Sequence, residues 1–199
     1  MEENVFNQMA NKYDTEERQE LANIIADEIK KNVAGKQYHS LLDYGGGTGL
    51  VTFQLADHFE KGWLVDSSPE MVQVAQSKIE QQQLQHFEAM AFNLAEDTSL
   101  DIKADVIVLS LVLLHVPDIE PLLQRLNEPL NAGGQLIIVD FDKNEKVQHP
   151  KVHNGFTEAE IQRALHHTGF RNVNMHTFHH GSNIFMKQDA SLFIAASTK

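Results

Sequence analysis

The stretch Leu41-Leu42-Asp43-Tyr44-Gly45-Gly46-Gly47-Thr48-Gly49 decides how this chain folds, because an apolar run ends in an acid and opens directly onto glycines at 45, 47 and 49. Glycine permits the sharp turn that leads out of a buried strand, and it lets a ligand approach the main-chain N–H groups closely. We expect a helix over about 50–59, whose amino end would add a positive field at the same place. The pattern is typical of a loop that binds a nucleotide-like cofactor.

The spacing of these glycines argues against a dinucleotide. The dinucleotide fingerprint requires glycine at its first, third and sixth positions, and the sixth position counted from Gly45 is Leu50. Asp43 would place a carboxylate beside the loop, where it repels phosphate and attracts an ammonium group. The Lys of a Walker loop is also missing, since Thr48-Gly49-Leu50 stands in its place. The loop therefore favours a cationic, zwitterionic cofactor.

A second short apolar run, Gly62–Asp66, also ends in an acid. An acid after the second strand of such a unit can accept the hydrogens of both ribose hydroxyls. We therefore expect Asp66 to bind a ribose. NAD and adenosine-based cofactors share this geometry, so Asp66 alone does not discriminate between them.

Five regions, in order along nearly the whole chain, resemble motifs of the class I S-adenosylmethionine-dependent methyltransferases, in their small-molecule branch. They are the lead-in Phe6–Asp14, the Asp43–Gly49 loop, Val65–Met71, the fourth-strand region Asp105–Ser110 with Leu114–Asp118, and Leu130–Asp140. The resemblance implies an α/β fold that is doubly wound and Rossmann-like, with a seven-stranded, mostly parallel sheet and an antiparallel last strand. It also implies an N-terminal helical lid over residues 1–36 and a cofactor-binding domain over 37–199.

Capping signals and hydrophobic periodicity predict the elements between these motifs. The expected helices are one opened by Asp14 and Glu17 and ending near Gly35, one capped by Ser68 before Pro69, one from Ile119 to Leu126, and one opened by the capping box Thr157-x-x-Glu160 and ending at Gly169. The expected strands include Leu84–Leu94, Asp105–Leu113 and two that resemble the closing strands of the family, Val173–Phe178 and Leu192–Ala196. This alternation implies a parallel sheet with right-handed crossovers.

The resemblance implies S-adenosyl-L-methionine as cofactor and S-adenosyl-L-homocysteine as product. Asp43 would hold the ammonium group of the methionine part, and Asp66 the ribose. Asn93 and Leu94 would hold the adenine, because Asn, which replaces the commoner Asp, still accepts a hydrogen bond from the adenine amine. The other cofactor-binding residues implied by the family are Tyr13, Tyr44, Gly45, Gly46, Gly47, Gly49, Ser67, Met71, Ser110 and Leu111. Capping, turn or core-packing roles remain the alternatives for several of these side chains.

Histidines are the candidates for the acceptor side of the site. His115 matches the second His of the Leu-His-His segment of the family, and a neutral His can accept a proton near pH 7. His115 is therefore the candidate catalytic base, with packing at a helix start as the alternative. His149 and His153 flank Pro150 in the expected substrate-entry loop. Pro150 argues against the helical turn that would let them share a metal, so no metal site is predicted.

The composition of the chain limits the kinds of molecule on which the protein is expected to act. With 199 residues, of which 42% are hydrophobic and 22% charged, the chain is expected to form one domain. The absence of cysteine excludes disulfides, thiolate metal sites and cysteine nucleophiles. A net charge of −12 disfavours nucleic acids, and the acidic N-terminus and short apolar runs indicate neither a signal peptide nor a membrane span. We expect a cytoplasmic protein that acts on a small molecule, and no pattern indicates its oligomeric state.

Two other functions stay open. A non-catalytic module would bind S-adenosylmethionine or S-adenosylhomocysteine without transferring the methyl group. An NAD-dependent oxidoreductase is disfavoured by the glycine spacing and by the absence of a Tyr-x-x-x-Lys pair. Among methyl acceptors, Ser110–Leu113 lacks both the Asn/Asp-Pro-Pro-Tyr/Phe motif of amide and adenine methyltransferases and the metal-binding Asp of catechol-type enzymes. An O, N or C atom of a small metabolite remains.

Overall fold

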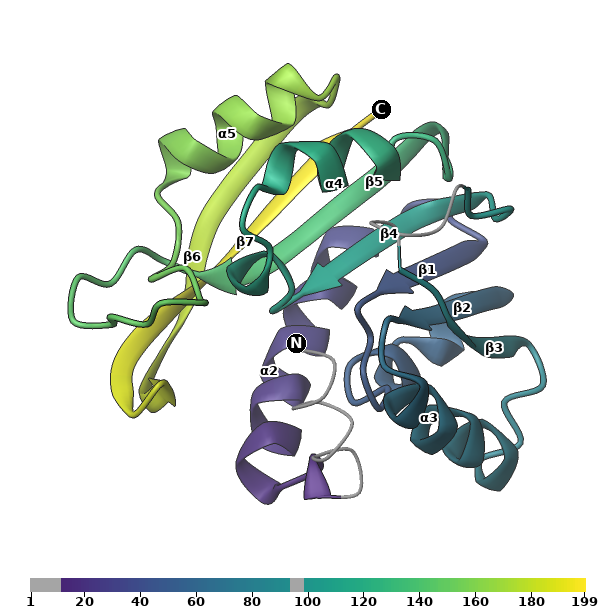
Figure 1. Ribbon diagram of the computed structural model, residues 1–199. Coiled ribbons are helices and arrows are strands. Elements are labelled where there is room, and N and C mark those ends of the chain that lie inside the picture. Colours follow the sequence, from purple (N-terminus) through teal and green to yellow (C-terminus); the bar gives the residue numbers. More distant parts are fainter. Residues whose placement is uncertain (1–11, 94–98) are drawn as a thin grey trace.

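A seven-stranded sheet forms the centre of the protein in a computed structural model that describes residues 12–93 and 99–199 (Figure 1). The strands are β1 Ser40–Tyr44, β2 Lys61–Asp66, β3 Phe87–Ala91, β4 Ala104–Ser110, β5 Leu130–Phe141, β6 Arg171–Phe185 and β7 Gln188–Thr198. Their order is β3-β2-β1-β4-β5-β7-β6, in which β7 runs antiparallel to both neighbours while the other paired strands are parallel. The predicted doubly wound sheet with an antiparallel last strand is confirmed.

Helices cover both faces of this sheet. They are α2 Glu16–Val33, α3 Pro69–Gln81, α4 Ile119–Leu126 and α5 Glu158–His167, and the 3₁₀ turns are η2 Thr52–Gln54, η3 Ala56–His58 and η4 Leu113–His115. Figure 1 shows α4 and α5 together on one face and α2 on the opposite face, and α3 packs on β2 and β3. Strands β1 and β4 are thereby buried on both sides, which is why Leu41, Leu42 and the whole run Val106–Leu109 have no exposed surface.

Local capping chemistry sets the starts of two helices as predicted. Ser68 caps α3, with Pro69 at its first position. Thr157 and Glu160 form a complete capping box at the start of α5, with the Thr157 side chain accepting from the Glu160 N–H and the Glu160 side chain accepting from the Thr157 N–H. After α5, Gly169 adopts a φ of +92°, the left-handed conformation in which helices commonly end.

The predicted cap of α2 is wrong. The helix begins at Glu16 and is capped by Thr15, whose Oγ1 accepts a hydrogen bond of 3.3 Å from the Arg18 N–H. Asp14 lies one residue too early to cap, and its carboxylate turns instead to Thr48 and Lys78, far along the chain. The segment before α2 is therefore tied to the glycine loop.

The α-helix predicted over 50–59 is also wrong, since the 3₁₀ turns η2 and η3 occupy this segment. Val51, Thr52 and Phe53 are β-branched or aromatic, which makes them weak helix formers. The Thr52 hydroxyl also bonds inward to Asp43. The segment that follows the loop therefore contributes no long helix dipole, and side chains must supply more of the electrostatics of the loop.

Two strands are shorter than predicted at the edge where the parallel strands end. In the described part of the predicted strand Leu84–Leu94, residues 84–93, only β3 is extended, and the predicted strand Asp105–Leu113 stops at Ser110. Leu111 has a φ of +55°, which a branched side chain rarely adopts and which ends the strand. In contrast, β6 and β7 extend well beyond their predicted lengths and form a long hairpin with register shifts.

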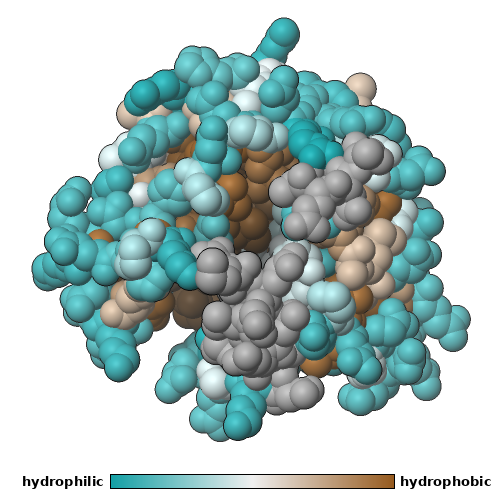
Figure 2. Space-filling model, in the orientation of Figure 1, coloured by the Kyte–Doolittle hydropathy of each residue, from teal (hydrophilic) through white to brown (hydrophobic). Residues whose placement is uncertain are grey.

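The face drawn in Figure 2 is mostly polar, and it is hollowed near its centre, where hydrophobic residues form the walls. The hollow lies close to the place where β4 ends in Figure 1.

Among the described residues, 12–93 and 99–199, no helix combines the length and apolar character that crossing a bilayer requires.

Two glycines with positive φ allow a test of the backbone packing next to β5. A Cβ on Gly155 (φ +91°) would lie 2.2 Å from the carbonyl oxygen of Asp142, whereas a Cβ on Gly35 (φ +74°) would meet nothing within 4 Å. Gly35→Ala should lower the free energy of unfolding by about 1 kcal/mol, from conformational strain alone. Gly155→Ala should cost about 3 kcal/mol or more, because backbone atoms must also move. Urea denaturation measures both, and equal losses would contradict this packing.

Candidate functional site

The glycine loop between β1 and η2 has a conformation that only glycine adopts easily. Gly45, Gly47 and Gly49 have φ angles of +77°, +57° and +86°. The N–H groups of Gly45 and Gly46 donate to the carbonyl oxygen of Val65, at 2.7 and 3.2 Å, so the loop is held against the end of β2. The glycine pattern thus has a structural cause, and it brings the loop next to the acid that ends β2.

Asp43 lies at the base of this loop and is almost fully buried, with 1% of its surface exposed. Its Oδ2 accepts a 2.5 Å hydrogen bond from the Thr52 hydroxyl, while its Oδ1 is buried and has no partner among the residues that the structure describes. Burial raises the pKa of Asp43 to about 7, against the Thr52 hydrogen bond, which lowers it, and with a smaller upward contribution from Asp66. An unpartnered buried carboxylate oxygen is costly, and a cationic or N–H donor would complete the site.

Asp66 ends β2 beside the same loop. Its Oδ2 accepts from the Gly47 N–H at 2.8 Å and its Oδ1 from the Ser68 N–H at 2.9 Å. Burial raises the pKa of this carboxyl group, and the two backbone hydrogen bonds oppose the rise. Because a carboxylate has about four lone-pair positions and Asp66 is only partly buried, it can still accept hydrogen bonds from hydroxyls.

Other predicted cofactor residues lie around these two acids. Asn93 follows β3 and is held near Asp66 by the 2.9 Å hydrogen bond from the Phe92 N–H to the Asp66 carbonyl. Ser67 is exposed, whereas Met71 has only 2% of its surface exposed and packs in the core. Leu94 lies outside the described residues. The acids and Asn93 therefore share the edge at which β1, β2 and β3 end.

Both predicted tyrosines are partly buried. Tyr44 ends β1 and packs against the hydrophobic core. The Arg18 guanidinium stacks 4.0 Å above the ring of Tyr13. Burial raises the pKa of Tyr13, Arg18 lowers it, and the negative charges of Asp66 and Asp14 raise it further. Tyr13 is therefore close enough to Asp66 for their charges to interact.

The end of β4 contributes Ser110, Leu111 and the turn η4, which carries His115. Leu111, with its positive φ, donates its N–H to the Val139 carbonyl at 2.8 Å. Non-glycine residues in this conformation often occur at functional sites, where neighbouring structure holds the strain. His115 is partly exposed at the last position of η4.

A buried acid for which no role was expected, Asp140 of β5, holds η4 in place. It has no exposed surface, and its two oxygens accept from the Leu114 N–H at 3.1 Å and the Phe141 N–H at 2.8 Å. Burial raises the pKa of Asp140 to about 7, against these backbone hydrogen bonds. Like Asp43 and Asp66, it follows an apolar run, which is the one sequence signal that could have identified it.

The two histidines predicted on the substrate side have different surroundings. His153 donates its backbone N–H to the Leu114 carbonyl at 2.8 Å, and its Nε2 lies 2.8 Å from the Val116 carbonyl, which requires a proton on that nitrogen. His153 therefore bonds to η4 and to the residue after it, as Asp140 bonds to η4 through the Leu114 N–H. His149 is exposed, and its Nδ1 accepts from the Lys151 N–H. Among the described residues, no three His, Asp or Glu side chains are grouped as metal ligands.

Neutralising Asp43 should change how stability depends on pH. Its pKa is about 7 in the folded protein and 3.8 ordinarily, so the folded state holds the proton more tightly and the free energy of unfolding falls as pH rises from about 4 to 7. Asp43→Asn keeps an oxygen for Thr52 and carries no charge. In this variant, the part of the fall in the free energy of unfolding that comes from Asp43 should disappear. At pH 8 the variant should be more stable than the wild type by a few kcal/mol, at about 1.4 kcal/mol per pKa unit.

Urea unfolding from pH 4 to 8 measures this difference. Asp140 contributes its own slope to both proteins, and Asp57→Asn, at an exposed acid of η3, is the control and should follow the wild type. Wild-type and Asp43→Asn curves that stay parallel throughout would show that Asp43 is not a buried, strained acid.

Comparisons with known proteins agree with this geometry. Residues 13–175 match the family described as "Methyltransferase domain". The chain is 26% identical over 138 residues, 66% of its length, to an uncharacterized methyltransferase of Schizosaccharomyces pombe, and 30% identical over 120 residues, 59% of its length, to a ubiquinone biosynthesis O-methyltransferase of Coxiella burnetii. These matches cover 48% and 50% of the relatives, so the chain spans about half the length of the curated relatives it matches.

Among solved structures, an S-adenosylmethionine-dependent methyltransferase from Aquifex aeolicus has the same fold, with a TM-score of 0.72, 20% identity, and 96% of this chain and 97% of the other covered. The family match extends over most of the chain, from the segment before α2 into β6. This protein therefore belongs to the methyltransferase domain family.

Proposed function

We propose that this protein transfers the methyl group of S-adenosylmethionine to an O, N or C atom of a small metabolite and releases S-adenosylhomocysteine. The observation that supports this most is the pair of acids near the ends of β1 and β2. Asp43 has a buried oxygen without a partner among the described residues, and Asp66 is partly exposed beside the glycine loop. The ammonium group and ribose hydroxyls of the cofactor supply the kinds of donor that such acids accept.

The position of the acids in the sheet supports the same function. The chain moves outward from β1 to β2 and β3 on one side and from β4 to β5 on the other, so the strand order reverses between β1 and β4. Open α/β sheets bind their ligands in the crevice at the carboxyl ends of the strands next to such a reversal. The glycine loop, Asp66 and the strained Leu111 all lie at that edge.

The charge of the site argues against a diphosphate. Asp43 and Asp66 are close enough for the charge of one to raise the pKa of the other. A pyrophosphate at the loop would have to face both carboxylates, and the long helix whose dipole could offset them is replaced here by 3₁₀ turns. A ligand with a positive charge near Asp43 relieves this repulsion.

When bound, S-adenosylmethionine supplies a methyl group already activated by the sulfonium. The residues of the chain then need to bind, orient and exclude water. Asp43 and Asp66 fix the two ends of the methionine–ribose portion, while Ser110 and Leu111 line the end of β4. Asp140 accepts a hydrogen bond from the Leu114 N–H, and His153 donates to the Leu114 and Val116 carbonyls, so His115 is carried on a well-held turn. There it accepts the proton that a hydroxyl or amine acceptor loses.

A hydroxyl is the first acceptor to test. The Coxiella burnetii relative is by name an O-methyltransferase. An acceptor that loses a proton when it is methylated also gives His115 a chemical role. A carbon or thioether acceptor without an acidic proton would give it none.

Calorimetric titration should separate the cofactor classes. Wild-type protein should bind S-adenosylhomocysteine and show no heat with NAD. Asp66→Ala should raise the dissociation constant for S-adenosylhomocysteine at least tenfold, because hydrogen bonds from hydroxyls to a carboxylate are lost. The control Asp57→Asn should bind as the wild type does. Binding of NAD without S-adenosylhomocysteine would support the oxidoreductase alternative.

His115→Ala should separate binding from turnover. With phenolic and amine metabolite pools and S-adenosylmethionine labelled in its methyl group, the wild type should form S-adenosylhomocysteine. The variant should lose about 10²-fold or more in kcat and bind the cofactor unchanged, because general base catalysis typically contributes 10²–10⁴-fold. Unchanged turnover would remove His115 from catalysis. Cofactor binding without turnover in any pool would favour a non-catalytic binding module.

A further inference from the structure

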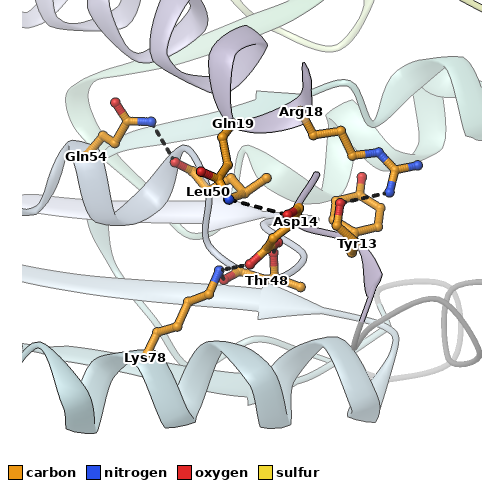
Figure 3. Close-up of polar contacts among 8 residues, drawn as sticks. All are labelled: Tyr13, Asp14, Arg18, Gln19, Thr48, Leu50, Gln54 and Lys78. Carbon is orange, nitrogen blue, oxygen red and sulfur yellow. Dashed lines mark hydrogen bonds and ion pairs between the residues drawn. The ribbon is translucent and has the colours of Figure 1, made fainter. Parts of the chain in front are cut away.

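Three side chains from distant parts of the sequence meet on the outer side of the glycine loop. Asp14, which precedes α2, accepts a 2.5 Å hydrogen bond from the Thr48 hydroxyl through Oδ1 and pairs with Lys78 of α3 at 2.6 Å through Oδ2. Lys78 in turn donates to the Thr48 carbonyl at 2.8 Å. Figure 3 shows Lys78 extending from its helix toward this junction, with Asp14 and Thr48 facing each other. We call these three residues the Asp14–Thr48–Lys78 latch.

The latch acts at Thr48, the one residue of 45–49 that is not glycine. Thr48 lies between Gly47 and Gly49, whose φ angles are +57° and +86° and which have no side chain to restrain them. Glycine loses more conformational freedom on ordering than any other residue. Thr48 is 1% exposed, and the latch binds both its hydroxyl and its carbonyl. Together with the hydrogen bond from the Gly47 N–H to Asp66, it fixes the middle of the loop.

The partners of Thr48 are themselves anchored. The Asp14 carbonyl accepts from the Gln19 side chain at 3.3 Å, and the neighbouring Tyr13 carbonyl accepts from Arg18 at 3.0 Å (Figure 3). The Asp14 and Lys78 side chains are only 26% and 21% exposed, so water competes weakly for their charges. The first turn of α2 is thereby connected to the loop, with Tyr13 placed near Asp66 in the same step.

We propose that Asp14, Thr48 and Lys78 are positioning residues that order the glycine loop before the cofactor arrives. The coupling to cofactor affinity rests on the proposed function, whereas the ordering of the loop does not. Without the latch, the glycines of the loop must be ordered by the ligand, and the cost appears as weaker binding. The chemical step itself involves none of the three side chains.

Amide hydrogen exchange of the ligand-free protein tests the ordering directly. In Thr48→Val, which keeps the shape but removes the hydroxyl, and in Asp14→Asn and Lys78→Met, exchange protection over 45–50 should fall about tenfold. Thr48→Ser restores the hydroxyl and should return protection toward that of the wild type. Asp27→Asn breaks an exposed 3.1 Å ion pair with Lys30 on α2 and is the matched control, expected to change nothing in the loop.

Protection in β5 and β7 should stay constant in all variants, which distinguishes a local effect from global destabilisation. In parallel, the dissociation constant for S-adenosylhomocysteine should rise about tenfold in Thr48→Val, Asp14→Asn and Lys78→Met, with kcat at saturating cofactor unchanged. Loop exchange equal to that of the wild type would overturn the latch, as would increased loop exchange with unaltered affinity. If the wild type bound no S-adenosylhomocysteine, the proposed function would fail, while the ligand-free exchange rates would still decide whether the latch orders the loop.

Discussion

The burial of the Asp43 carboxylate beneath the glycine loop is the constraint on which the rest of the site depends. One oxygen accepts from the hydroxyl of Thr52, the first residue of η2, and the other has no partner in the described part of the chain. The loop must pass closely over this acid, because a Cβ on Gly46 would lie 3.1 Å from the Asp43 carboxyl carbon. The protein thus keeps an unfavourable group where a cation would relieve it, and under the proposed function this is a trade of stability for function.

A repeated device organises the edge at which the parallel strands end. Each of three acids follows an apolar run: Asp43, Asp66 and Asp140. The carboxylate of each accepts a hydrogen bond from a neighbouring turn or loop. Asp43 holds η2, Asp66 holds the loop, and Asp140 holds the turn that carries His115. The buried strands give these acids fixed positions. The acids in turn hold irregular segments, which lack the regular backbone hydrogen bonds of a sheet. Rigid strands therefore specify the geometry of the loops that form the candidate site.

Features of local origin could be predicted from the sequence, while those that depend on distant contacts could not. The glycine loop, the Ser68 cap and the Thr157–Glu160 box are encoded within a few residues and were predicted. The sequence predicts Asp14 as a helix cap, but its carboxylate accepts from the Thr48 hydroxyl, which lies 34 residues away and leaves no local signal. The role of Asp140 depends on a backbone N–H 26 residues earlier. The segment 50–59 is a partly local case, because Val51, Thr52 and Phe53 are weak helix formers and Thr52 also bonds to Asp43.

The titration of the Asp43 carboxyl group, followed by carbon NMR with and without S-adenosylhomocysteine, tests the central claim most directly. The account predicts a pKa near 7 in the free protein, held up by burial, and a clear fall once the ammonium group of the ligand lies beside the free oxygen. An ordinary carboxyl pKa in the free protein, or a value that the ligand leaves unchanged, would contradict it.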